Sequence, residues 1–230
     1  MRRTARTAVP SFLLVAVVLG GCGGTATPPP HTSMTVTTGT GGTAVTSPDA
    51  ATATALWPTA ASPTRYPTPE SAARGFAIGF LSMVDPVVGT FRAGDARSGE
   101  VPVRPGPGGP ETTVLVRQLT AADSWWVLGS ATAAVSISQP AALATVSSPL
   151  TVQGTSTAYE ATVNVSLRVD DVAAPLAEGT AMGGSNGQMG PFGTTLAFAA
   201  PTGRWGAVVV STISAKDGTV SQATAIRVRF

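Results

Sequence analysis

Hydrophobic residues along the chain follow two different spacings, which predict one helix and several strands. Between residues 68 and 86, apolar side chains recur at every third or fourth position, namely at Ala73, Phe76, Phe80 and Val84. This spacing places them on one face of a helix. Thr68 and Pro69 suit the N-cap and the first turn, and Pro86 is expected to end the helix.

After the helix, apolar and polar residues alternate in short runs, which is typical of half-buried strands. Such runs lie at 100–104, 112–119, 124–131, 161–169 and 226–230, with further strands expected at 195–199 and 207–211. Arg227 and Arg229 alternate with apolar residues and are expected to point outward. Residues 208–210 are all valine, so this strand is expected to lie in the middle of a sheet.

These elements predict a mainly β protein with two domains. Residues 64–138, with one helix followed by antiparallel strands, are expected to form a small α+β domain. Residues 139–230 hold about seven short strands, which predicts a β-sandwich. Residues 23–63 consist mostly of Thr, Ala, Pro, Gly and Ser. Such a tract buries too little apolar surface to fold, so we expect a disordered tether there.

The first 22 residues have the pattern of a secretion signal. Arg2, Arg3 and Arg6 precede a run of eight apolar residues at 12–19, which is shorter than the ~20 residues that span a bilayer. The sequence LGGC at 19–22 resembles a bacterial lipobox. The resemblance implies that Cys22 carries a diacylglycerol and anchors the protein in the cell membrane, facing the outside of the cytoplasmic membrane. A chance cysteine behind an ordinary signal peptide is the alternative.

Charge and composition exclude several classes of function. Three of the 14 basic residues lie in the signal, so the mature chain keeps 11 basic against 12 acidic residues. No basic stripe of the kind that nucleic-acid binders use is evident, and no nucleic-acid partner is expected. His31, the only histidine, lies in the tether, so histidine-dependent triads, thiol enzymes and ordinary zinc sites are excluded from the folded part. We therefore expect no enzyme, no cofactor and no metal.

Four short motifs occur in order in the C-terminal part. They are SPLTVQG at 148–154, YE at 159–160, GPF at 190–192 and DG at 217–218. Together they resemble the immunoglobulin-like domain of bacterial spore-germination proteins. The resemblance implies an extracytoplasmic immunoglobulin-like β-sandwich over residues 139–230, often paired with another envelope domain and without known catalytic residues. The stretches 94–101 and 112–119 look like the N-terminal part of actinobacterial envelope lipoproteins that carry the same sandwich.

The densest polar group in the folded part comprises Asp95, Arg97, Ser98 and Glu100. One interpretation is a solvated hairpin with internal ion pairs. Another is a recognition loop in which Arg97 grips a carboxylate or phosphate of a partner. A glycosidase pair of Asp95 and Glu100 is a third interpretation, which requires a sugar cleft between the two carboxylates.

The pairs Trp125–Trp126 and Asp170–Asp171 are two further candidate features. Trp125 and Trp126 are neighbours on a predicted strand, so their rings face opposite sides of the sheet. One ring fills the core, and the other is expected against the helix, the sandwich or a partner. Asp170 and Asp171 offer two carboxylates, too few for the 6–8 oxygen ligands of calcium, and are interpreted as a turn.

Together these patterns predict a non-catalytic, lipid-anchored cell-envelope protein. It is expected to act as a binding or scaffolding module for an envelope protein or a cell-wall polymer. The candidate partner-binding residues are Asp95, Arg97, Ser98, Glu100 and Trp126. The alternative is a small-molecule carrier or sensor with a pocket in residues 64–138.

Overall fold

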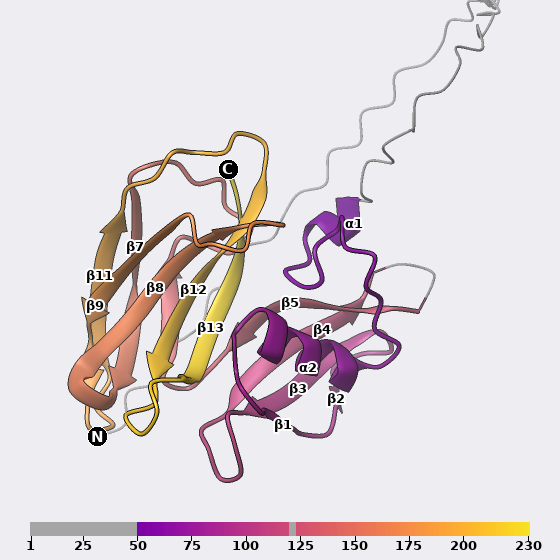
Figure 1. Cartoon of the computed structure of the whole chain (residues 1–230), viewed down its shortest axis with the longest axis horizontal. Coiled ribbons are helices and arrows are strands. Elements are labelled where there is room, and N and C mark those ends of the chain that lie inside the picture. The colour runs from indigo at the N-terminus through magenta and orange to yellow at the C-terminus, as the bar shows by residue number, and fades with distance from the viewer. Residues whose placement is uncertain (1–49, 120–122) are drawn as a thin grey trace, which may run out of the picture. The chain divides into compact units, whose positions relative to one another are not determined.

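A computed structural model describes residues 50–119 and 123–230 (Figure 1). The predicted signal, the lipid on Cys22 and the tether up to residue 49 lie outside the described residues. Within the described ranges, no helix is both long and apolar enough to cross a membrane. Residues 50–230 belong to one compact unit.

The described chain is mainly β, as the sequence predicts. Its helices are α1 (Ala50–Ala53), α2 (Pro69–Gly79) and the 3-10 turn η1 (Tyr159–Ala161). The strands up to residue 139 are β1 (Val87–Val88), β2 (Arg92–Ala93), β3 (Ser98–Arg104), β4 (Thr112–Gln118), β5 (Trp125–Ala131) and β6 (Val135–Gln139). The later strands are β7 (Leu150–Ala158), β8 (Thr162–Val169), β9 (Ala177–Met182), β10 (Gly184–Ser185), β11 (Gly190–Leu196), β12 (Trp205–Ile213) and β13 (Val220–Arg229).

The strands form a large sheet and a small one. The large sheet has the order β1-β3-β4-β5-β13-β12-β8-β9, with β2 paired to β3. In the small sheet, β6 and β11 pair antiparallel with β7, and β10 pairs parallel with the end of β7. The large sheet runs through both predicted domains, and the predicted boundary between 138 and 139 falls inside β6.

Helix α2 begins where the sequence predicts but ends earlier. The Thr68 hydroxyl accepts a hydrogen bond from the Ser71 amide, and the Ser71 hydroxyl lies within bonding distance of the Thr68 amide, which completes a capping box. The helix ends at Gly79 rather than at Pro86. Val84 is 78 % exposed and does not continue the apolar face.

The early end of α2 has a local cause. The amide of Leu81 donates to the Phe76 carbonyl, and the amide of Met83 donates to the Ala77 carbonyl, so the last turn closes on itself. Ser82 between them has a φ of 61°, a left-handed conformation that ends a helical path. A spacing pattern alone does not contain this turn.

Two hydrophobic cores flank the large sheet. One lies under α2 and includes Phe76 and the β3–β5 valines, but also Val209 and Ala223 from β12 and β13. The other lies between the two sheets and includes Phe192, Val208 and Val210. Valines on both faces of β12 are therefore buried, which confirms the prediction that residues 208–210 lie in the middle of a sheet.

Residues 50–63 pack on the sheet, whereas the sequence predicts a disordered tether up to residue 63. Leu56 is 1 % exposed. The amides of Leu56 and Trp57 both donate to the Val127 carbonyl, and the Val127 amide donates to the Trp57 carbonyl. The few apolar side chains of this Thr- and Ala-rich stretch are thus enough to dock it on the edge of β5, and the folded part already includes Ala50.

Arg227 is buried, which corrects the prediction that it points outward. Its side chain is 2 % exposed, and its two terminal nitrogens bind the two carboxylate oxygens of Asp170 at 2.5 and 2.6 Å. It also donates to the carbonyl of Ala53, the last residue of α1, and so caps the C-terminal end of this helix. Alternation places Arg227 on the same face of β13 as Ala223 and Ala225, and this face is covered by the N-terminal part of the chain.

The strand predicted at 195–199 lies earlier in the structure. Strand β11 spans Gly190–Leu196, so the GPF motif opens the strand instead of preceding it. Phe192 is 4 % exposed and fills the core between the sheets, as its motif predicts.

Candidate functional site

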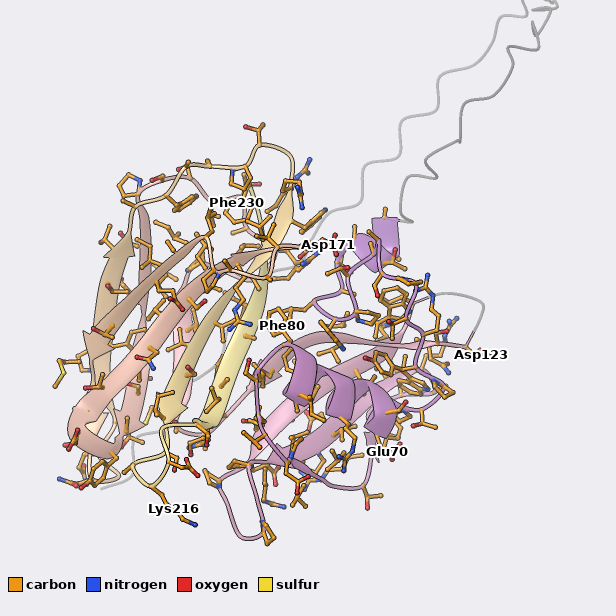
Figure 2. All side chains as sticks on the ribbon, viewed as in Figure 1. Glu70, Phe80, Asp123, Asp171, Lys216 and Phe230 are labelled. Carbon is orange, nitrogen blue, oxygen red and sulfur yellow. The ribbon has the colours of Figure 1, made fainter. Side chains whose placement is uncertain are left out.

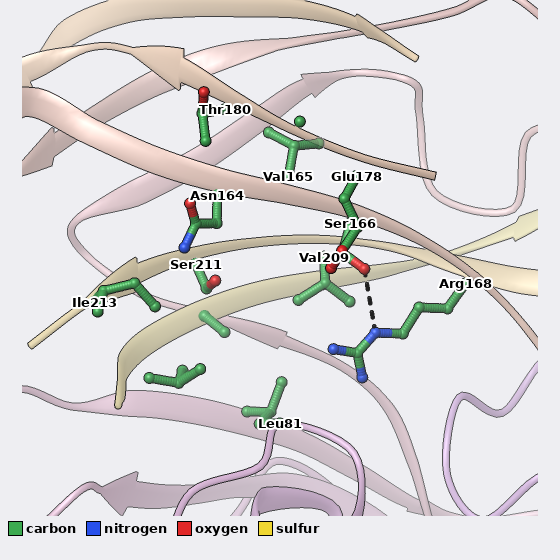
Figure 3. Close-up of a pocket in the computed structure, with 13 residues that line it drawn as sticks. Leu81, Asn164, Val165, Ser166, Arg168, Glu178, Thr180, Val209, Ser211 and Ile213 are labelled. Carbon is green, nitrogen blue, oxygen red and sulfur yellow. Dashed lines mark hydrogen bonds between the residues drawn. The ribbon is translucent and has the colours of Figure 1, made fainter. Parts of the chain in front are cut away.

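A cavity of about 540 Å³ lies on the face of the large sheet that points away from the core between the two sheets (Figure 3). Its side chains come from β8, β9, β12 and β13, and from Leu81 just after α2. Four neighbouring strands give this cavity a rigid floor. We call it the Arg168 pocket.

Strand β8 supplies the polar side chains of the Arg168 pocket by simple alternation. Val163, Val165 and Leu167 point into the core between the sheets. Asn164 and Arg168, which lie between or beside these positions, therefore point to the opposite face, together with Ser166.

Antiparallel register arranges further polar side chains in rows across the floor. Asn164 lies opposite Thr180 on β9 and opposite Ser211 on β12. Ser166 lies opposite Glu178 on β9. Directly opposite residues share a face, so the amide, the hydroxyls and the carboxylate all border the same cavity.

Arg168 is half-buried at one end of the pocket, beside Phe80. Its Nε donates to the Ser166 hydroxyl at 3.3 Å, and its Nη1 donates to the Phe80 carbonyl. The guanidinium carbon lies 4.9 Å from the centre of the Phe80 ring, in cation–π geometry. Figure 2 shows Phe80 at the end of α2, beside the strands of the large sheet. Burial lowers the pKa of Arg168, and the nearby charge of Glu178 opposes this shift.

The arrangement is suited to binding. The Ser166 hydroxyl, which borders the pocket, accepts a hydrogen bond from the Arg168 cation. An activating general base would instead accept the proton of the hydroxyl, and a guanidinium does not do this. Among residues 50–119 and 123–230, no group of three or more His, Cys, Asp and Glu side chains is placed to hold a metal ion. What the pocket offers is a set of hydrogen-bond donors and acceptors and two opposite charges.

A second cavity, of about 500 Å³, is mostly apolar. It is lined by side chains of β4 to β6, β13 and the loop at Ala142–Leu143, including Leu115, Leu128 and Ile137. Its one charged side chain, Arg227, is already paired with Asp170, so this cavity offers no unpaired charge to a ligand. The Arg168 pocket is therefore the stronger candidate site.

The polar group predicted from the sequence lies at the turn between β2 and β3 and at the start of β3. The Asp95 carboxylate accepts a hydrogen bond from the Arg97 amide at 2.7 Å. This bond, followed by one from the Ser98 side chain, lowers the pKa of Asp95. Asp95 therefore caps the turn. Arg97 and Glu100 are exposed.

Register brings Ser98 and Trp126 into one row. Each lies opposite Arg117 of β4, and Glu100 shares their face of the sheet because it is two residues from Ser98. Ser98, Glu100 and Trp126 therefore share this face, whereas Asp95 and Arg97 lie in the turn before β3. They are not part of the Arg168 pocket.

The two tryptophans face opposite sides of β5, as expected. Trp125 packs in the core under α2, with its ring edge-on to Phe91. Trp126 is 1 % exposed, and the guanidinium of Arg65 lies 5.1 Å from its ring centre. Because Arg65 covers the buried ring, Trp126 presents no stacking surface to a partner. This corrects the prediction that Trp126 is a partner-binding residue.

Asp170 and Asp171 have separate roles. Asp170 neutralises Arg227, and the Asp171 carboxylate accepts a hydrogen bond from the Thr59 hydroxyl at 2.6 Å. Asp171 has a φ of 60°, which agrees with the predicted turn.

Sequence reasoning missed Asn164, Ser166, Arg168 and Glu178. The alternation in 161–169 predicts a half-buried strand, but it does not assign a binding role to the polar positions. The available signal was an arginine on an otherwise uncharged polar face of a strand. Its significance depends on Phe80 and Leu81, which are distant in sequence.

Comparison with known families supports the assignment of an immunoglobulin-like fold to the C-terminal domain. The model for the immunoglobulin-like domain of bacterial spore germination matches residues 134–219. These residues include β6 to β12 and most of the Arg168 pocket, whereas Leu81, Val220 and Ala223 lie outside the match. No curated protein and no solved structure matches the chain. The chain thus ends in an immunoglobulin-like β-sandwich, preceded by a small α+β part that shares its large sheet.

Proposed function

We propose that this protein is a non-catalytic binding module of the cell envelope that recognises a protein or a cell-wall polymer. The observation that carries the proposal is the Arg168 pocket, where a half-buried cation and several hydrogen-bonding side chains lie on a rigid four-stranded floor. Polar groups fixed in this way confer specificity on a binding site. The immunoglobulin-like domain is consistent with this role, although a fold alone does not define one.

The proposal includes attachment to the membrane. In the proposed arrangement Cys22 carries the lipid, and the residues between Cys22 and Ala50 connect the lipid to the folded part on the outer side of the cytoplasmic membrane. The support is the LGGC sequence after a short apolar run. Mass spectrometry of the protein from a membrane fraction tests it: a diacylglycerol on Cys22 is expected, and an unmodified Cys22 or a chain cut elsewhere contradicts it.

In-cell cross-linking tests the binding function. Tagged full-length protein is cross-linked in cells, and the captured molecules are identified by mass spectrometry. Arg168→Gln is compared with Arg74→Gln, a matched change at an exposed position on α2. Arg97→Ala tests the predicted loop separately.

The expected result is a reproducible envelope partner that Arg168→Gln loses and Arg74→Gln retains. A partner that only Arg97→Ala loses would move the binding surface to the turn between β2 and β3. Capture of nothing beyond abundant neighbours contradicts the proposal.

A small-molecule carrier or sensor is the second candidate function. The favouring observation is the size of the Arg168 pocket, about 540 Å³, which falls within the range of small-molecule sites. This pocket combines Leu81 with residues of the sandwich. The sequence alone predicts the carrier pocket within residues 64–138, so its location differs from that prediction. A carrier is expected to rise in melting temperature with its ligand according to RT ln(1 + [L]/Kd), without capturing a macromolecule.

A further inference from the structure

Arg168 is a half-buried cation that forms no ion pair with a carboxylate of the described residues. The ion pairs of the described residues join Arg92 and Arg104 to Glu111, and Arg227 to Asp170. Arg168 is held instead by two neutral oxygens and an aromatic face. A guanidinium that has lost part of its hydration without forming an ion pair is a site that favours an anion.

One nitrogen of the Arg168 guanidinium, Nη2, is available to a ligand. Nε and Nη1 donate to Ser166 and Phe80, whereas Nη2 has no hydrogen-bond partner among the described residues. These two bonds and the Phe80 ring fix the orientation of the fork. Nη2 is therefore a preorganised donor for one oxygen of a ligand carboxylate, at the end of the Arg168 pocket.

A negative charge borders the same pocket. Glu178 is exposed on β9, opposite Ser166, and its charge acts on Arg168 without an ion pair within 4 Å. Figure 3 shows Glu178 and Arg168 on neighbouring parts of the pocket wall. A purely anionic ligand would be repelled by Glu178, whereas a ligand with a nearby ammonium group complements both charges.

The rest of the pocket sets the shape of such a ligand. Asn164 and Ser211 provide an amide and a hydroxyl on the floor, which match the polar groups of an amino acid or a peptide unit. Leu81, Val209 and Ile213 provide an apolar wall for a small side chain. About 540 Å³ accommodates either an amino acid or a short peptide.

From these contacts we infer that the Arg168 pocket binds a small zwitterion, an amino acid or a dipeptide with small apolar side chains. Its carboxylate binds Nη2 of Arg168, and its ammonium group lies against Glu178. This inference rests on the second candidate function, a small-molecule carrier or sensor, and specifies the ligand that the Arg168 pocket takes.

Isothermal titration of the full-length protein, purified in detergent, tests the inference. The probes are alanine and alanyl-alanine, followed by N-acetyl-alanyl-alanine and alanyl-alanine amide, which each lack one charge. The variants are Arg168→Gln, Arg168→Lys and Glu178→Gln, with Arg74→Gln as the matched control at an exposed position. The Glu178 side chain is exposed and makes no hydrogen bond or ion pair among the described residues, so Glu178→Gln keeps the test valid if Arg168→Gln unfolds.

We expect alanine or alanyl-alanine to bind, and the tighter of the two identifies a free amino acid or a peptide as the natural class. Blocking either charge of the dipeptide weakens binding by about tenfold or more. In Glu178→Gln, the acetylated and free dipeptides bind about equally, because the partner of the ammonium group is gone. Arg168→Gln loses binding of every carboxylate probe, Arg168→Lys keeps part of it, and Arg74→Gln binds as the unchanged protein does.

Two results overturn the inference. One is that neither alanine nor alanyl-alanine binds at millimolar concentration. The other is that the blocked dipeptides bind as tightly as the free dipeptide. If a partner captured in cells still depends on Arg168 while these probes fail, the zwitterion is excluded and the binding module for a protein or polymer stands. If that capture also fails, the proposed function fails with it.

Discussion

Asp170 neutralises the most deeply buried charge described in the chain, that of Arg227, whose side chain is 2 % exposed. Asp170→Asn leaves this guanidinium buried without a counter-charge, and we expect the free energy of unfolding to fall by about 3–5 kcal/mol. Urea unfolding followed by tryptophan fluorescence measures the change.

The neighbouring Asp171→Asn is the matched control. Asp171 is exposed and binds only the Thr59 hydroxyl among the described residues, so a loss of about 1 kcal/mol or less is expected. Equal losses in the two variants would show that the Arg227 pair does not hold the fold as described.

Asp217, in the turn between β12 and β13, makes a pH-dependent contribution to the stability of the fold. Its carboxylate accepts hydrogen bonds from the hydroxyl and the amide of Thr219, and these bonds lower its pKa. A lowered pKa in the folded state means that ionised Asp217 stabilises the fold. This contribution is complete above the ordinary pKa of aspartate and is lost as the pH falls through the lower folded value.

The expected outcome is that acid destabilises the unchanged protein more than it destabilises Asp217→Asn. Urea unfolding from about pH 5 down to about pH 2 measures both. If the free energy of unfolding changed with pH in the same way in both proteins, Asp217 would not contribute to acid stability.

At the scale of elements, the segment that precedes α2 is part of the fold. Leu56 is 1 % exposed in the core under α2, whereas Leu143 is 51 % exposed on a loop. We expect Leu56→Ala to reduce the free energy of unfolding by about 2–5 kcal/mol. Leu143→Ala, the same change at the surface, is expected to cost less than about 1 kcal/mol.

The comparison separates two descriptions of residues 50–63. If they were a disordered tether, Leu56→Ala would be as mild as Leu143→Ala. A large loss in Leu56→Ala alone supports the packed segment that binds Val127.

Local signals predicted the elements that depend on local chemistry. Thr68 and Pro69 mark the start of α2, the alternation in 161–169 marks β8, and the DG at 217–218 marks a turn with Gly218 at a φ of 71°. The errors concern contacts between distant segments. The end of α2 depends on a turn at Ser82, and the burial of Arg227 depends on Ala53 and Asp170.

At the scale of the whole molecule, the predicted binding residues and the pocket lie on different parts of the large sheet. Exposed polar residues such as Arg97 are conspicuous in sequence, so they were the natural candidates. Arg168 is a candidate because the end of α2 partly buries it, and this contact joins segments that are distant in sequence. Strand alternation predicts which residues share a face, but it does not predict which face is covered.

The two predicted domains share one sheet, and nothing local in the sequence indicates this. A single residue pair, Ser130 with Ala225, joins β5 to β13, and Val209 and Ala223 of the sandwich complete the core under α2. These connections place Leu81 beside the strands of the matched immunoglobulin-like domain. The candidate site therefore depends on both parts of the chain.

Site-specific photo-cross-linking in cells tests the central claim, that this protein binds its partner through the Arg168 pocket. A photoreactive residue replaces either Thr180, exposed at the pocket, or Ala96, exposed in the turn predicted as a recognition loop. The account predicts a defined adduct from position 180 that disappears in Arg168→Gln and persists in Arg74→Gln. An adduct from position 96 alone, or an adduct from position 180 that is indifferent to Arg168, would contradict it.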